Sequence, residues 1–252
     1  MKVSVIIAHD KRRGSSSLNE CVSSIKAQGY TEIMVAEEGS KSEARNNAVY
    51  TAVGDILIFF DDDATLRRHC IEELLEPFKD PGVAIVGGVN IPRHTDNWRE
   101  CAASALLSSP LTMFKSSARY TPKGDVRETD ESEIVLCNMA IRRDVFLKAG
   151  GFPLDVIPCE ENVLINRVAD LGYKIVYNPF AVVYHERPKA FMPYWKKIFA
   201  YGKGRGIMMR KREGNPKMLW RPKLRWVAYA IAAAGHYLSY IGGVLWGLVR
   251  GK

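Results

Sequence analysis

The chain has few cysteines, and they lie far apart. Five occur in 252 residues, at Cys21, Cys70, Cys101, Cys137 and Cys159. Their number is odd, and no two show the close spacing of about two to four residues that structural zinc sites use. This excludes a disulfide framework and a cysteine zinc site, and we expect reduced, mostly buried thiols in a cytosolic compartment. A signal peptide is not expected either, because Val3–Ala8 already has the pattern of a core strand.

Acidic residues are almost absent from the last quarter of the chain. From Glu186 onward there are 15 Lys/Arg and 2 Asp/Glu, a net charge of +13, whereas the whole chain carries +8. The first 185 residues hold the other 21 basic and 26 acidic residues, a net charge of −5. The basic character therefore belongs to the C-terminal segment, which favours an anionic partner. Overall, 47% hydrophobic and 25% charged residues exclude both a disordered chain and a polytopic membrane protein.

Charged side chains are missing altogether from the 24 residues Trp226–Val249. As a helix this run spans about 36 Å at roughly 1.5 Å per residue, enough to cross a hydrocarbon core of about 30 Å. Basic residues are denser on its N-terminal side, which predicts a cell-membrane location with the preceding domain in the cytoplasm. Two alternatives stay open, a buried core helix and a re-entrant helix bent at Gly242-Gly243. The segment 191–225 mixes aromatic and basic residues, as helices in the lipid headgroup region do.

Strand and helix patterns alternate along the first part of the chain. Short apolar runs predict strands at 3–8, 32–36, 56–60 and 83–89. Apolar residues at helical spacing predict helices between them, at about 18–25, 42–51 and 69–78. The alternation indicates βαβ units and a Rossmann-like α/β domain with a doubly wound, mostly parallel sheet.

The remainder is less regular. Residues 92–134 have weak periodicity, and we expect a lid or binding loop without clear elements there. Beyond it, a strand is predicted at 134–141 and helices at 144–149 and 160–171. Two short strands are predicted at 173–177 and 181–184.

Three consecutive carboxylates, Asp61, Asp62 and Asp63, follow the strand predicted at 56–60. Ligands of doubly wound sheets bind beyond the carboxyl ends of the strands. Carboxylates so close together repel one another, and a hard divalent cation that also binds substrate phosphate relieves the repulsion. Because side chains alternate along extended backbone, Asp61 and Asp63 can share one face while Asp62 points elsewhere. The alternative interpretation is an acidic loop at a helix N-terminus.

Several further stretches occur in a characteristic order. They are Ala36-Glu37-Glu38-Gly39-Ser40, Ala44-Arg45-Asn46, Gly54-Asp55 through Asp63, Cys137 to Arg143 with Gly150-Gly151-Phe152, and Glu160-Glu161 with Arg167, Gly172-Tyr173, Tyr177-Asn178-Pro179 and Tyr184-His185. Together they resemble glycosyltransferase family 2, whose members are inverting enzymes with a GT-A fold. The resemblance covers about residues 1–205. It implies a GT-A catalytic domain over 1–190, with a donor half at about 1–91 and an acceptor half at about 92–190. An interfacial segment at 191–225 and a transmembrane or re-entrant helix at 226–249 would follow.

The resemblance also implies a role for each matching residue. Asp61, Asp63 and His185 would hold Mn²⁺ or Mg²⁺ on the donor diphosphate, and Glu161 would be the catalytic base. The nucleotide-sugar contacts would be Ala8, Glu37, Glu38, Arg45, Asp61 and Asp62. The acceptor or lipid-phosphate side would have Asn138, Glu160, Lys203 and Arg205.

Simpler interpretations remain for some of these residues. His185 is also compatible with an ordinary surface or core histidine, and Glu160-Glu161 with an acidic first helix turn favoured by the helix dipole. The family usually has Asp where this chain has Glu161, and Asp-Asp where it has Glu37-Glu38.

The predicted function is metal-dependent transfer of a sugar from a nucleotide sugar to a hydroxyl of a lipid-linked or surface glycan at an anionic membrane surface. The alternatives are a polyprenyl-phosphate glycosyl synthase and a catalytically silent, membrane-anchored relative. Nucleic acid is not an expected partner, because the apolar run directly after the basic cluster makes anionic lipid the better match.

Overall fold

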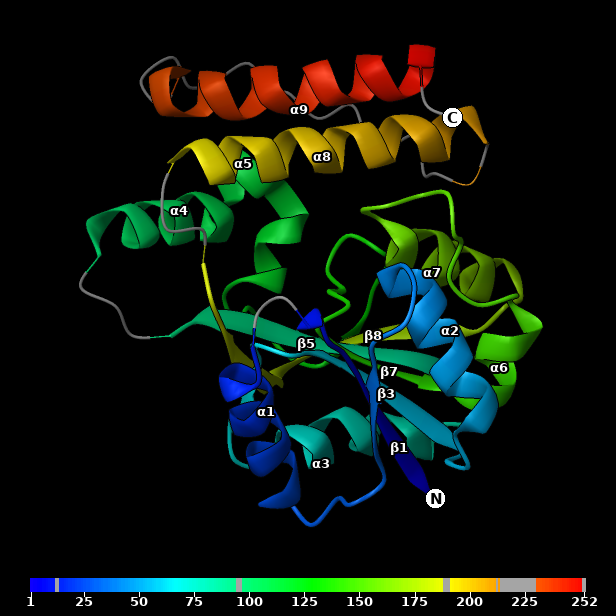
Figure 1. The fold of residues 1–252 in the computed structure, drawn as a ribbon. Coiled ribbons are helices and arrows are strands. Elements are labelled where there is room, and N and C mark those ends of the chain that lie inside the picture. The colour runs from blue at the N-terminus through cyan, green and yellow to red at the C-terminus, as the bar shows by residue number, and fades with distance from the viewer. Residues whose placement is uncertain (12–13, 94–96, 188–190, 212, 214–229, 251–252) are drawn as a thin grey trace.

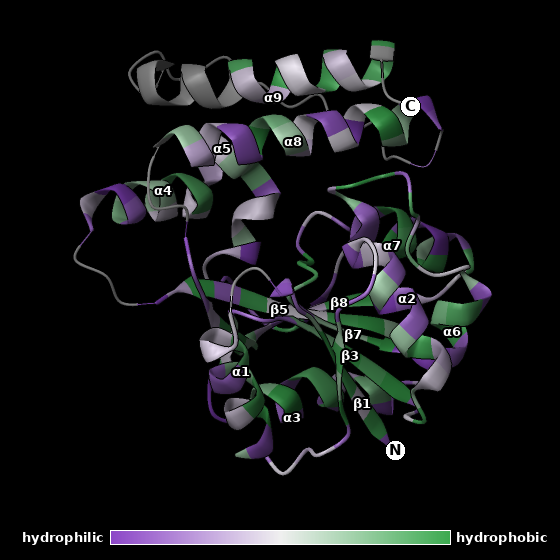
Figure 2. Ribbon diagram, in the orientation of Figure 1, coloured by the Kyte–Doolittle hydropathy of each residue, from purple (hydrophilic) through white to green (hydrophobic). Residues whose placement is uncertain are grey.

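The computed structural model describes residues 1–11, 14–93, 97–187, 191–211, 213 and 230–250. The described residues form one eight-stranded sheet with helices on both faces and a layer of two long helices beyond one edge (Figure 1). The strands at the centre of the sheet are strongly hydrophobic along their length (Figure 2). Both faces of these strands are therefore covered, as in other α/β sheets.

The first half of the chain confirms the predicted alternation. Its elements are β1 (Val3–Ala8), α1 (Ser16–Lys26), β2 (Ile33–Ala36), α2 (Lys41–Thr51), β3 (Ile56–Asp61), β4 (Thr65–Leu66), α3 (Cys70–Leu75), a 3-10 helix (Glu76–Lys79) and β5 (Val83–Pro92). Alternate residues of β3 face opposite cores. Ile58 and Phe60 pack with α1 and α3, whereas Leu57 and Phe59 pack with the helices of the other face.

The prediction of a mostly parallel sheet is wrong, because the sheet is mixed. Its strand order is β2-β1-β3-β7-β5-β8-β4, with β6 paired to β8. The pairs β1–β2, β1–β3 and β5–β8 are parallel, whereas β7 (Asn138–Arg142) lies antiparallel between β3 and β5. The chain enters β7 at Asn138, beside Phe60 near the carboxyl end of β3, so β7 runs back in the opposite direction. The hydrophobic periodicity of a strand does not indicate its direction within the sheet, so the sequence could not predict this reversal.

The middle region is more regular than predicted. It contains α4 (Trp98–Ser108), α5 (Pro110–Met113), a 3-10 helix (Phe114–Arg119) and the short strand β6 (Arg127–Glu128). Only Ala103 and Leu107 of α4 are buried, so its apolar stripe is too narrow to be recognised from periodicity. The caps were the available signal, because Asn97 accepts a hydrogen bond from the Arg99 N–H and Ser109 accepts one from the Leu111 N–H.

Two further differences concern the later elements. The strands predicted at 173–177 and 181–184 are one strand, β8 (Lys174–His185), and the predicted strand at 134–141 begins only at Asn138. The helices α6 (Arg143–Lys148) and α7 (Glu160–Asp170) are close to their predicted bounds. Pro179 can lie within β8 because this strand bulges there: Gly87 of β5 pairs with Tyr177 and Val89 pairs with Val182, which leaves residues 178–181 outside the regular pairing.

The C-terminal layer consists of α8 (Phe191–Arg210) and α9 (Ala230–Arg250), which lie side by side (Figure 1). Glycines allow the two backbones to touch. A Cβ added at Gly202 or Gly206 would lie 2.0 or 2.3 Å from the carbonyl oxygens of Tyr240 or Val244. The same holds on α9, where a Cβ at Gly243 would lie 2.0 Å from the Phe199 oxygen. Small residues four positions apart permit such close helix packing.

The predicted membrane crossing does not hold for the described part of the chain. Within that part, no helix combines the length and the apolar character needed to span a bilayer. Glycine, serine and tyrosine residues interrupt the apolar sequence of α9, and one side of this helix packs on α8. Residues 226–229 of the predicted span lie outside the described residues, as do Arg221, Lys223 and Arg225 of the basic cluster.

The glycine contacts give a matched test of this helix pair. Gly243→Ala should lower the melting temperature, because its new Cβ would meet backbone at 2.0 Å. The neighbouring variant Gly242→Ala should keep or raise it, since its Cβ would lie 3.5 Å from the Phe199 ring and alanine favours the helix by about 1 kcal/mol. Thermal unfolding followed by circular dichroism measures both. Equal effects of the two variants would contradict this packing.

Candidate functional site

The predicted metal ligands meet at the carboxyl end of β3. The Nε2 atom of His185, at the end of β8, lies 3.1 Å from Asp63 Oδ1 and 3.5 Å from Asp61 Oδ2. The two strands reach the same edge of the sheet because β4, which follows Asp63, pairs with β8 through Thr65 and Tyr184. Side chains more than 120 positions apart in the sequence thus converge on one point.

The donor atoms of this cluster fit a hard or borderline divalent cation. His185 Nδ1 lies 2.8 Å from the Glu186 carbonyl oxygen. A carbonyl oxygen only accepts hydrogen bonds, so Nδ1 donates to it, and Nε2 is the ring nitrogen that faces the two carboxylates. This orientation is the one that metal-binding histidines adopt. One nitrogen and two carboxylates can therefore hold Mn²⁺ or Mg²⁺, with nitrogen favouring Mn²⁺.

Cys137 lies in the same cluster, and the sequence did not single it out for this role. Its sulfur, one Asp61 oxygen and one His185 nitrogen all lie within 4.8 Å of one another. Burial first, and then the charge of Asp61, raises the pKa of this thiol to about 12. The protonated thiol is a poor ligand for a hard cation, so Asp63 is the better third ligand.

The middle carboxylate of the triplet points elsewhere, in agreement with the alternation of strand side chains. Asp62 is 1% exposed, and its Oδ2 lies 2.8 Å from His9 Nδ1 and accepts a hydrogen bond from the Asp10 N–H. Asp62 therefore fixes the segment that follows β1. His9 was not predicted as a site residue because a single histidine after a strand carries no pattern.

That segment forms one wall of a pocket of about 420 Å³ next to the carboxylates. The pocket lies between the ends of β1 and β2 and the first turn of α2, and it is lined by Ala8, His9, Asp10, Lys11, Ala36, Glu37, Gly39, Ser40, Lys41 and Ala44. Ala8 and Glu37 are predicted nucleotide-sugar contacts that it brings together. Glu38, the third one in this part of the chain, is exposed and does not line the pocket.

Arg45 links the cluster of Asp61, Asp63 and His185 to α7. Its guanidinium is almost completely buried, with Nη2 2.8 Å from Asp61 Oδ1 and Nη1 3.3 Å from Glu160 Oε1. Burial opposes ionisation of Asp61, but the hydrogen bond to His185 and the charge of Arg45 outweigh it and lower the pKa of Asp61. Asp61 is thus kept ionised by groups on two different elements, β8 and α2.

The first turn of α7 carries the predicted base and its neighbour. Glu160 and Glu161 are 6% and 7% exposed, and Arg119 Nη1 lies 3.8 Å from Glu161 Oε1. Burial, followed by the charge of Glu161, raises the pKa of Glu160 to about 7. Two adjacent carboxylates therefore have different environments, one against Arg45 and the other against Arg119.

The residues predicted for the acceptor side lie in three separate places. The amide of Asn138 donates hydrogen bonds to the carbonyls of Val89 and Ala181 and so joins three strands. The Lys203 ammonium lies 4.1 Å from the centre of the Trp246 ring. Arg205 is buried against Glu131. Glu160 is joined to Asp61 of the carboxylate-histidine cluster through Arg45. The acceptor contacts stay predictions.

Comparisons with known proteins find similarity to glycosyltransferases. The sequence pattern of the family described as glycosyl transferase family 2 matches residues 31–150. An O-antigen chain rhamnosyltransferase of Salmonella anatum is 31% identical over 166 residues, which cover 63% of this chain and 51% of the relative. A glucosyl-dolichyl phosphate glucuronosyltransferase of Haloferax volcanii is 24% identical, covering 74% and 69%. The chain thus spans about half the length of the Salmonella relative.

The fold also has a solved counterpart. A mannosyltransferase of Pyrobaculum calidifontis, solved in complex with GDP-mannose and Mn²⁺, is similar with a TM-score of 0.61 and 20% sequence identity. The similarity covers 100% of this chain and 76% of that one. At this level of identity the comparison establishes a shared α/β fold.

The raised pKa of Glu160 predicts a pH dependence of stability. Between the ordinary value of 4.5 and about 7, the folded protein binds a proton that the unfolded chain has lost. The free energy of unfolding therefore falls as pH rises through this window. Glu160→Gln removes the effect, so its melting temperature relative to the wild type should rise between about pH 5 and pH 8. Thermal unfolding in EDTA measures the difference, with Asp170→Asn at the exposed end of α7 as control. A difference independent of pH would refute the prediction.

Proposed function

We propose that the chain is a member of glycosyltransferase family 2, whose pattern matches residues 31–150, and that it transfers a sugar from a nucleotide-sugar donor to a hydroxyl of a glycan acceptor, with inversion at the anomeric carbon. One observation carries the proposal. The carboxylate-histidine cluster and Glu160, the neighbour of the predicted base Glu161, lie on either side of the buried Arg45, next to a pocket beyond the ends of β1 and β2.

The donor would occupy that pocket, with its diphosphate directed toward the end of β3. Asp61, Asp63 and His185 would hold the divalent cation there. The bound cation would neutralise charge that develops on the departing nucleoside diphosphate. In the pocket, the Glu37 carboxylate can accept hydrogen bonds from the ribose or the base, and it is held by Lys11 at 3.0 Å.

Glu161 would act on the acceptor. Its carboxylate accepts the proton of the acceptor hydroxyl while the hydroxyl oxygen bonds to the anomeric carbon. The bond from that carbon to the diphosphate oxygen breaks at the same time, and the electron pair leaves with the nucleoside diphosphate. Attack from the side opposite the leaving group inverts the anomeric configuration.

A lipid-linked glycan is the acceptor class that we propose. Relatives named for dolichyl-phosphate-linked substrates support it, one from Haloferax volcanii and one from Methanococcus voltae that is 24% identical over 194 residues. A carboxylate base suits a sugar hydroxyl, whereas a lipid phosphate is already ionised and needs none. A polyprenyl-phosphate glycosyl synthase and a catalytically silent relative are the outcomes against which the proposal is tested.

We further propose that the α8–α9 layer rests on the cytoplasmic surface of the cell membrane without crossing it. The side of α9 turned away from α8 exposes Leu238, Ile241, Leu245 and Leu248, at helical spacing. Neither helix has an acidic residue, and the basic residues of α8 that are not buried are Lys196, Lys197, Lys203 and Arg210. An apolar face with basic neighbours suits the boundary between headgroups and acyl chains of anionic lipid.

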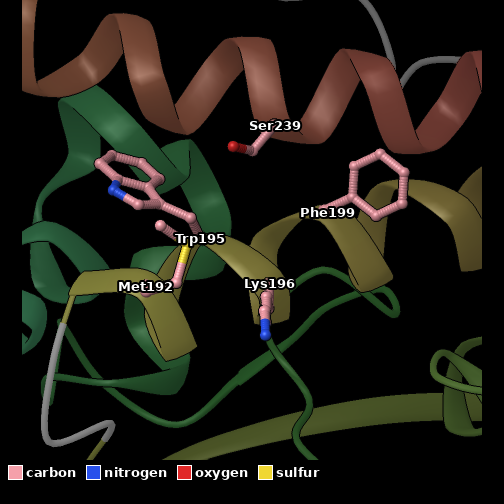
Figure 3. Close-up of a pocket in the computed structure, with 5 residues that line it drawn as sticks. All are labelled: Met192, Trp195, Lys196, Phe199 and Ser239. Carbon is pink, nitrogen blue, oxygen red and sulfur yellow. The ribbon is translucent and has the colours of Figure 1, made fainter.

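A shallow pocket between the two helices supports the same orientation. It measures about 370 Å³ and is lined by Met192, Trp195, Lys196, Phe199 and Ser239. In Figure 3 the rings of Trp195 and Phe199 rise from α8 toward α9, on either side of Ser239. Aromatic rings beside an exposed lysine are typical of the interfacial region of a membrane.

Substitutions test the proposed chemistry. Asp63→Ala should abolish Mn²⁺-dependent hydrolysis of the cognate nucleotide sugar, because a cation ligand is lost. Glu161→Gln should keep donor binding and lower kcat for transfer by about 100-fold or more, as loss of a general base does. A panel of nucleotide sugars assayed with and without EDTA measures both, and Asp170→Asn on α7 is the control. No binding of any donor would favour the silent relative, and transfer that survives Glu161→Gln would favour the phosphate acceptor.

Vesicle binding tests the proposed location. Leu245→Glu, at a side chain 58% exposed on α9, should weaken binding to vesicles of phosphatidylglycerol and phosphatidylcholine by about tenfold. Val53→Glu makes a comparable change at a side chain that is 66% exposed and lies just after the C-terminal end of α2. This variant should leave binding unchanged. Flotation of the protein with vesicles measures the bound fraction. Equal binding by the two variants would contradict the proposed surface.

A further inference from the structure

A buried group of charges connects α8 to the first turn of α7. Arg119, Glu131, Asn162 and Arg205 are each 7% exposed or less. Together with Glu161, they contain two guanidinium groups and two carboxylates in the interior between the domain and α8. Ionised groups in such a place require partners, because an uncompensated buried charge is strongly destabilising.

Arg119 is held from three sides so that one edge faces Glu161. Its Nε donates to the Ser132 carbonyl at 2.8 Å, and its Nη2 donates to the Glu131 carbonyl and to Asn162 Oδ1. The remaining nitrogen, Nη1, lies 3.8 Å from the Glu161 carboxylate. The guanidinium plane is thus oriented by contacts that do not involve Glu161.

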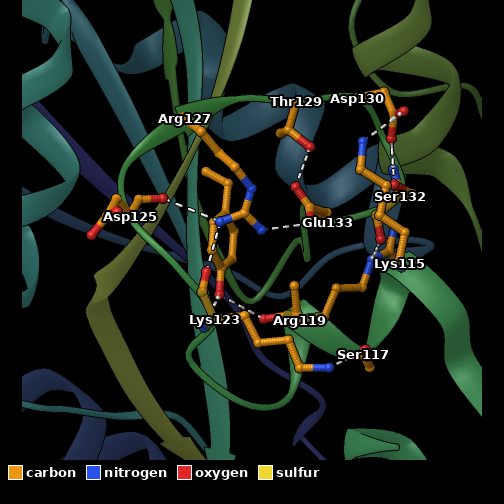
Figure 4. A network of polar contacts seen from close by, with 12 residues as sticks. Lys115, Ser117, Arg119, Lys123, Asp125, Arg127, Thr129, Asp130, Ser132 and Glu133 are labelled. Atoms are coloured by element: carbon orange, nitrogen blue, oxygen red, sulfur yellow. Dashed lines mark hydrogen bonds and ion pairs between the residues drawn. The ribbon is translucent and has the colours of Figure 1, made fainter. Parts of the chain in front are cut away.

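The loop that supplies those carbonyls is itself braced. Arg127 and Thr129 both donate to the Glu133 carboxylate, and Lys115 pairs with Asp130 at 3.0 Å (Figure 4). Arg119 lies beside these contacts in the same view. The position of the Arg119 guanidinium is therefore set by a loop that is itself held by these contacts.

Arg205 provides the charge that Glu131 requires. Its Nη1 donates to Glu131 Oε1 at 2.9 Å, and its Nη2 donates to Asn162 Oδ1 at 3.3 Å. Both guanidinium groups thus share the amide oxygen of Asn162. Glu131 is 1% exposed, so without Arg205 its carboxylate would need another cation. Arg119, bonded to the same asparagine and to the Glu131 backbone, could supply it only by turning away from Glu161.

We propose that Arg119 is the positioning residue of the Glu161 carboxylate, and that Arg205 of α8 keeps it available for this role by neutralising Glu131. The inference rests on the proposed function of Glu161 as the base. Small displacements of a catalytic group can lower rates by about 100-fold. The helix α8 also packs directly on the segment before α7, because a Cβ at Gly204 would lie 2.0 Å from the Pro158 oxygen. This contact joins the α8–α9 layer to the segment that leads into Glu161.

The test compares single and compensated variants of the full chain. Arg205→Met should lower kcat for transfer by about 10- to 100-fold and leave KM for the nucleotide sugar within about twofold. In Arg205→Met/Glu131→Gln no buried carboxylate competes for Arg119, so kcat should return to within a few-fold of the wild type. A double variant as slow as Arg205→Met, or an Arg205→Met variant with normal kcat, would overturn the proposal.

A second variant keeps the proposal testable if Arg205→Met does not fold. Arg119→Lys preserves the charge but cannot contact Ser132, Asn162 and Glu161 together, so kcat should fall about tenfold or more with an unchanged donor KM. Unaltered kcat in Arg119→Lys would overturn the positioning role. Melting temperatures measured alongside separate misfolding from misplacement. The wild type is measured in the same assay. If the wild type transfers no sugar, the proposed function fails, whereas a failure of the variants alone concerns only the positioning role.

Discussion

The repulsion among carboxylates at one edge of the sheet is the constraint on which the rest of the site depends. Asp61, Asp63, Glu160 and Glu161 gather there from two elements, and all lie in or near the interior. Arg45 is the group that makes this gathering possible, because its single guanidinium contacts both Asp61 and Glu160. Without it the two pairs of carboxylates would face each other directly, and burial would favour protonation over the charges that the proposed chemistry needs.

The C-terminal helices are part of the same electrostatic arrangement. Arg205 extends from α8 into the interior and pairs with Glu131. Arg119, at the end of the 3-10 helix Phe114–Arg119, faces Glu161. The outer side of α9 is apolar, and its inner side meets α8 through glycines. One layer of two helices therefore joins an exposed apolar surface to the immediate surroundings of the proposed base.

Prediction from the sequence succeeded where one local signal determined the result. Short apolar runs located β1 and β3, and the order of motifs brought together Asp61, Asp63 and His185, which the structure places side by side. It failed for α4, whose buried stripe is narrow, and for the direction of β7, which depends on where the chain re-enters the sheet. The predicted membrane crossing failed over residues 230–249 because a run without charges does not reveal whether another helix covers one side of it.

The sequence by itself determined the alternation of strands and helices, the resemblance to glycosyltransferase family 2 and the residues that carry the charges, because these depend on local periodicity and on side-chain chemistry. Only the tertiary structure decided the partners of those charges. It set Arg45 between Asp61 and Glu160, it assigned Asp62 to His9, and it buried Arg205 against Glu131. The physical reason is that these pairs join residues 16 to 115 positions apart on different elements, so they depend on how the layers pack, and no local pattern records that packing.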